Sequence, residues 1–116
     1  MLVRLYAGDD GQSHFEDLDF DTWPAVWDLN LANARISFAR RGEPGHPYFS
    51  SWHPEPRRQY LIIMTGQMEV TVGDGSVRVL NPGDVLLAED LTGQGHEIRG
   101  LGDQPFLRVT IPTDEE

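Results

Sequence analysis

Apolar and polar residues alternate along several short stretches of the chain. Met68, Val70 and Val72 are separated by polar residues, and the stretch 107–111 repeats the same period of two. A period of two places neighbouring side chains on opposite faces of a β-strand. The pattern therefore predicts half-buried strands of a curved sheet rather than helices.

Turn-forming residues separate these stretches. Twelve glycines and eight prolines occur in the chain, and the apolar segments between them recur about every ten residues, as in an all-β sandwich or barrel. Gly73-Asp74-Gly75 predicts a tight hairpin turn, and Asn81-Pro82-Gly83-Asp84 predicts a second turn. The predicted strands cover residues 2–6, 34–40, 48–53, 59–64, 67–73, 76–80, 85–88, 95–99 and 105–111.

Composition limits the kind of protein. The 116 residues suit one domain, 1–116, with a barrel core over about 34–111 and an N-terminal strand and wrapping segment over 1–33. The net charge of −10 argues against nucleic acid and anionic membranes as partners. Neither a signal sequence nor an apolar run of spanning length is present, so we expect a cytoplasmic protein. Cysteine and lysine are absent, which excludes thiolate ligands and lysine chemistry.

A set of polar residues precedes one apolar strand. His53, Glu55, Arg57 and Gln59 share one parity, which would point them to one face of an undistorted strand. The same parity continues into apolar residues at 61 and 63, as expected where a pocket lies at the mouth of a small barrel. The alternative for 54–57 is a solvated loop, because its two prolines cannot donate hydrogen bonds to a sheet.

A second candidate segment is Gly93-Gln94-Gly95-His96. Glycines on both sides of Gln94 allow the backbone to approach another part of the chain closely. Taken alone, a histidine in the position of His96 is more often an ordinary strand histidine than a site residue.

These segments together resemble the two conserved blocks of the cupin superfamily. His53 matches the first histidine of the first block, Glu55 falls on its second histidine, and Gln59 on its glutamate, with Gly66 as the closing glycine. In the second block Gly93 and His96 match. The remaining departures are Leu91 in place of proline and Gly100 in place of asparagine.

The resemblance implies a small antiparallel jelly-roll β-barrel with a degenerate metal motif. It gives His53, Glu55, Gln59 and His96 as candidate ligands for a divalent metal such as Fe, Mn, Ni or Zn, and a metal-free site is the alternative. Small cupins commonly form homodimers through edge strands, for which 2–6 is the expected edge.

The ligand and the reaction stay open at this stage. We expect a small molecule in the pocket, with Arg57 and Tyr60 as substrate-binding residues. Arg57 would bind an anionic group in a bidentate manner through its guanidinium. No nucleotide cofactor is expected, because the glycine-rich Gly73-Asp74-Gly75 is a hairpin turn. The chain is then a metal-dependent oxygenase or a metal-free isomerase or dehydratase, or else a non-catalytic module that binds a small molecule as a sensor.

Overall fold

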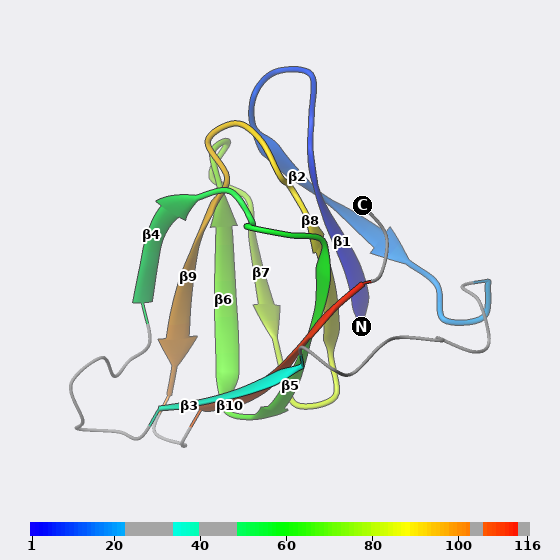
Figure 1. Ribbon diagram of the computed structural model, residues 1–116, viewed down its shortest axis with the longest axis vertical. Coiled ribbons are helices and arrows are strands. Elements are labelled where there is room, and N and C mark those ends of the chain that lie inside the picture. The colour runs from blue at the N-terminus through cyan, green and yellow to red at the C-terminus, as the bar shows by residue number, and fades with distance from the viewer. Residues whose placement is uncertain (23–33, 40–48, 103–105, 114–116) are drawn as a thin grey trace.

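The computed structural model describes residues 1–22, 34–39, 49–102 and 106–113, and these residues form ten strands in two sheets (Figure 1). The strands are β1 (Leu2–Ala7), β2 (Ser13–Leu18), β3 (Arg35–Ala39), β4 (Phe49–His53), β5 (Gln59–Thr65), β6 (Gln67–Val72), β7 (Val77–Leu80), β8 (Val85–Glu89), β9 (His96–Leu101) and β10 (Phe106–Pro112).

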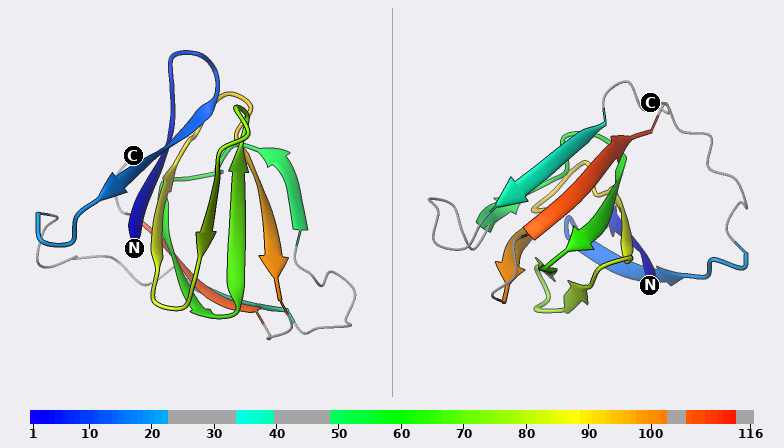
Figure 2. Two further views of the ribbon diagram at one scale, coloured as in Figure 1. Left: turned by 180° about the vertical axis from the view of Figure 1, so that it is seen from behind. Right: turned by 90° about the horizontal axis from the view of Figure 1, so that it is seen from below.

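The strand order defines the two layers. One sheet has six strands in the order β2-β1-β8-β5-β10-β3, and the other has four in the order β4-β9-β6-β7. Among the described pairings, only β1 with β8 is parallel. The predicted all-β fold of jelly-roll type is thus confirmed as two packed sheets (Figure 2). Hydrogen bonding between the described strands does not join the two sheets into a closed barrel.

The main core lies between the sheets and follows the period of two. Met68, Val70 and Val72 of β6 are buried, while the residues between them are half-buried. They pack against the inward-facing residues of the six-stranded sheet, including Leu61 and Ile63 of β5. Burial of each such side chain contributes about 1.5–3 kcal/mol, so the alternation seen in the sequence directly determines which face of each strand is buried.

The N-terminal strand occupies a different place from the one expected. β1 pairs with β2 on one side and with β8 on the other, so it is an internal strand. The prediction that 2–6 is a free edge for dimerisation is therefore wrong, because β2, formed by Ser13–Leu18, covers that edge. The homodimer itself stays a prediction. Within the expected wrapping segment, Ser13–Leu18 form β2, and residues 23–33 lie outside the described residues.

No helix long and apolar enough to cross a membrane is found in the described parts of the chain.

Candidate functional site

The two candidate histidines meet where the four-stranded sheet begins. His53 is the last residue of β4, His96 is the first residue of β9, and the two are direct partners in the antiparallel pairing. Their ring centroids lie 4.9 Å apart at an interplanar angle of 52°. The strand register alone therefore brings together two residues that are 43 positions apart.

Gly95 allows this close approach. Its φ of +80° lies in the left-handed region, and a Cβ at this position would overlap the carbonyl of His53. Gly93 is similar, with φ of +84° and the backbone of Gly11 in the space that a Cβ would need. Only glycine fits both the backbone angle and the space at these positions. The expectation from the Gly-Gln-Gly sequence, that the backbone approaches another segment here, is confirmed.

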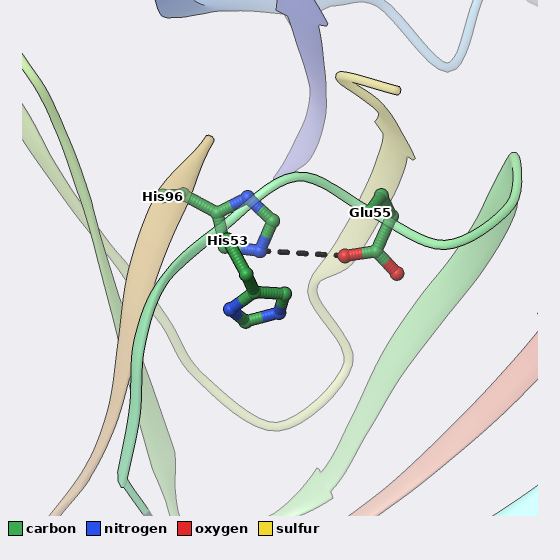
Figure 3. A group of neighbouring side chains, drawn as sticks. All are labelled: His53, Glu55 and His96. Atoms are coloured by element: carbon green, nitrogen blue, oxygen red, sulfur yellow. Dashed lines mark ion pairs between the residues drawn. The ribbon is translucent and has the colours of Figure 1, made fainter. Parts of the chain in front are cut away.

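Glu55 completes a cluster of three possible metal ligands. One ligand atom from each of His53, Glu55 and His96 lies within 4.8 Å of the others. Figure 3 shows the three side chains converging from β4, the loop after it and β9. The backbone N–H of Glu55 donates to the carbonyl of Asp90 over 2.9 Å and anchors the loop. The proline-rich segment is therefore structured at Glu55, whose side chain is buried.

Gln59, the fourth predicted ligand, touches this cluster through Glu55. Its Nε2 donates a hydrogen bond to Oε2 of Glu55, and both side chains are buried. The structure thus places all four predicted ligand residues in one neighbourhood. Gln59 faces the carboxylate with its amide nitrogen, which donates a hydrogen bond and cannot bind a cation.

Hydrogen bonds determine which ring nitrogen of each histidine faces the cluster. Nδ1 of His53 donates to the carbonyl of Ser51 over 2.6 Å, because a carbonyl oxygen can only accept. Nδ1 of His96 bonds Oδ2 of Asp90, also over 2.6 Å. A partner on Nδ1 fixes the ring orientation and makes Nε2 the nitrogen available to a metal, as is usual for metal-binding histidines.

Nε2 of His96 is a buried atom with the chemistry of a metal ligand. It lies 3.3 Å from Oε1 of Glu55, an ion-pair distance, but makes no hydrogen bond to any described residue. Ligands at about 2.1 Å from one ion must lie within about 4.2 Å of each other. A small closing movement of the three side chains would satisfy that limit. The donor set and the unpartnered nitrogen therefore fit a divalent metal.

Without a metal, the buried charges stabilise one another. Burial lowers the pKa of His96, but the bond to Asp90 and the nearby Glu55 outweigh burial and raise the pKa to about 9. Burial raises the pKa of Glu55, but His96 and Gln59 outweigh it and bring the pKa below its usual value. The metal-free site therefore contains an imidazolium between two carboxyl side chains, and a metal must displace the proton on Nε2.

Asp90 is a site residue that sequence reasoning missed. It directly follows β8 and is completely buried. Its Oδ2 also accepts a hydrogen bond from the hydroxyl of Ser13, over 2.6 Å. Glu89 is held by ion pairs to Arg4 and Arg58. The only available signal was the position of Asp90 at the end of an apolar strand.

A cavity of about 280 Å³ adjoins the cluster and lies between the two sheets. Its wall is polar near His53 and Glu55 and apolar at Leu61 and Ile98. The change from polar to apolar lining agrees with the pattern expected from residues 53–63. The lining residues are Arg35, His53, Pro54, Glu55, Pro56, Gln59, Leu61, Ile98 and Arg108.

The two predicted substrate-binding residues lie elsewhere. Tyr60 is buried on the opposite face of β5 with Leu2, Val85 and Leu87, as expected for a neighbour of the inward-facing Gln59. Arg57 is exposed in the loop before β5 and is not part of the cavity lining.

The chain matches known proteins in structure and not in sequence. No protein-family model and no curated protein sequence matches the chain. Three similar solved structures are iron(II) HppE in complex with its substrate, a cupin-like protein from Thermotoga maritima, and the cupin domain of Cnp3 from Schizosaccharomyces pombe. Their TM-scores are 0.45, 0.46 and 0.47, and their identities are 13%, 20% and 16%, respectively.

The matched regions cover 68%, 69% and 88% of this chain, in the same order. They cover 44%, 68% and 72% of the other chains, so the chain spans less than half the length of HppE. The all-β fold of jelly-roll type predicted from the sequence is confirmed by the strands and their pairing. Two of the three similar structures are themselves described as cupins.

Proposed function

We propose that the chain binds a divalent metal ion through His53, Glu55 and His96, and a small molecule in the adjoining cavity. The observation that carries the proposal is the convergence of three ligand atoms within 4.8 Å. The buried Nε2 of His96, which has no hydrogen-bond partner among the described residues, supports it. Two imidazoles and one carboxylate form a ligand set that suits iron, manganese, nickel or zinc.

The residues of the chain orient and tune this set. Ser51 and Asp90 fix the rings of His53 and His96 through their Nδ1 atoms. Gln59 holds one oxygen of Glu55, which leaves the other directed at His96. A bound ion would supply Lewis acidity and, if it is redox-active, oxygen chemistry. We therefore favour a metal-dependent enzyme acting on a small molecule, such as an oxygenase.

A metal-free function is the second candidate. It is favoured by one observation, the charged His96–Glu55 pair, which is stable without an ion because each group shifts the pKa of the other. In that case His53 and Glu55, which line the cavity, would act as acid and base in an isomerase or dehydratase. A non-catalytic sensor would use the same cavity without turnover.

Metal content of the purified protein tests the proposal. We expect one iron, manganese, nickel or zinc ion per chain, or stoichiometric uptake of one of them by the metal-free protein in calorimetric titration. His53→Ala should weaken that binding by about a hundredfold or more, because it removes one of three ligands. His14→Ala is the control, since His14 pairs with Asp10 on the surface, away from the cluster. Equal binding by the two variants would refute the proposal, and the metal-free candidate would take its place.

A further inference from the structure

We propose that the cavity selects small molecules that carry a carboxylate or phosphate group, and that Arg108 and Arg35 are the residues that bind this group. The inference deepens the proposed function and rests on it in one respect, namely that the cavity beside the metal cluster is the ligand site. It assigns the anion-binding role to two arginines that are distant in sequence from the candidate metal motif.

The strand pairing places both arginines on the inner face of the six-stranded sheet. Arg108 of β10 pairs with Ile63 of β5, a core residue, and so shares its face. Two residues further on, Thr110 pairs with Leu61 and with Arg35 of β3. Directly paired residues point to the same face, so Arg108, Thr110 and Arg35 lie on the inner face of the sheet.

In β10 the polar residues of the alternating pattern face the core, whereas in an ordinary amphipathic strand they face solvent. Thr110 is 3% exposed, whereas the apolar residues on either side of it belong to the outer face. A hydrophobic core alone gives no reason for arginine and threonine to face inward, because apolar residues at these positions would remove more apolar surface from water. A binding function on this face explains the arrangement.

The surroundings of Arg108 suit an anion between the sheets. Its Nη1 donates to Sδ of Met68 on the opposite sheet over 3.6 Å, so the guanidinium lies within the interior. Arg108 lines the same cavity as Glu55, and that carboxylate is already engaged by Gln59 and His96.

The charge balance of the cavity contrasts with that of the whole chain. The net charge of the chain is −10, yet the cavity lining contains two arginines and one carboxylate. A concentrated positive site in an acidic protein favours an anionic ligand over a neutral one. Guanidinium groups bind carboxylate and phosphate in a bidentate manner. The volume of about 280 Å³ is at the small end for ligand pockets and limits the ligand to a small metabolite.

Binding of small charged probes tests the inference. Butanoate, ethyl phosphate and the neutral butanamide are titrated into the protein by calorimetry, both metal-free and loaded with zinc. We expect one or both anions to bind, and butanamide to bind at least about tenfold more weakly. Arg108→Gln and Arg35→Gln should each reduce anion affinity, Arg108→Gln by about tenfold or more, because a charge-assisted bond is lost. The anion that binds more tightly identifies the ligand group.

Arg99→Gln is the matched control, because Arg99 is exposed on β9 next to the cavity residue Ile98. Arg35 is exposed at the start of β3, so its variant keeps the test valid if Arg108→Gln fails to fold. Equal binding of butanoate and butanamide, or an equal loss in all three variants, would overturn the inference. Arginine-dependent anion binding in a chain that takes up no metal would support the inference and refute the metal proposal. Metal uptake without anion preference would support the metal proposal and refute the inference.

Discussion

The carboxylate of Asp90 and the imidazole of His96 share a hydrogen bond of 2.6 Å, and neither side chain is exposed to solvent. The same oxygen, Oδ2, accepts the hydroxyl of Ser13 at the start of β2. Asp90 therefore links the N-terminal hairpin to the candidate metal site. Because it holds Nδ1, it also directs Nε2 of His96 toward Glu55.

Replacement of Asp90 by asparagine should lower the pKa of His96. The bond to Asp90 is the strongest of the influences that raise this pKa to about 9, and a neutral amide cannot stabilise the imidazolium in the same way. NMR titration of the His96 ring in the metal-free protein measures the shift. Ser13→Ala is the control, since it leaves the Asp90–His96 bond in place. An unchanged His96 titration in Asp90→Asn would contradict this account.

The stability of the metal-free protein should fall in alkaline solution. The pKa of His96 is about 9 in the folded state, against 6.5 for the ordinary side chain. The folded state therefore binds the proton more tightly, which stabilises it fully below about pH 6.5, and the gain is lost as the pH rises through about 9. Urea denaturation across this range should show a decreasing free energy of unfolding. In His96→Gln this part of the slope should disappear, and an identical slope in both proteins would count against the charged His96.

Much of the fold followed from sequence because period-two alternation reports burial directly. Met68, Val70 and Val72 were expected on one face, and they form part of the core. The first strand was misplaced because its alternation gives no information on its neighbours. The neighbour that covers it is β2, Ser13–Leu18. The acidic and aromatic residues of this stretch resemble those of a loop.

The site was partly predictable for the same reason. Parity grouped His53, Glu55, Arg57 and Gln59, but residues 54–58 form no strand and Arg57 is exposed. The other three side chains do come together. Tyr60 has the opposite parity from Gln59 and packs on the other face of β5. The position of Arg108 in the cavity lining could not be predicted, because a polar residue within an alternating strand is normally assigned to the solvent side. Only the pairing of β10 with β5 shows that it faces the core.

Gly95→Ala should destabilise the protein more than a glycine replacement elsewhere. Gly95 has φ of +80°, and a Cβ would overlap the carbonyl of His53. Gly75 has φ of +89° but open space around it, so Gly75→Ala measures the conformational cost alone. That cost is on the order of 1 kcal/mol, and Gly95→Ala should exceed it because β4 and β9 must move apart. Chemical denaturation of both variants gives the comparison. Similar losses would show that the backbone contact at His53 is less tight than described.

Gln59→Glu should destabilise the metal-free protein and increase the stabilisation that a divalent metal provides. Gln59 donates to Oε2 of Glu55, and both side chains are nearly inaccessible to solvent, at 5% and 6%. A second carboxylate there removes the donor and places two like charges together, which should cost about 1–3 kcal/mol in the metal-free protein. A divalent ion neutralises that repulsion, so zinc or manganese should raise the melting temperature of Gln59→Glu by more than that of the wild type. Gln59→Met, which loses the donor without adding charge, separates the two effects. If metal raises the melting temperature of Gln59→Glu no more than that of Gln59→Met, residue 59 lies too far from the ion for its charge to matter, and the site is limited to His53, Glu55 and His96.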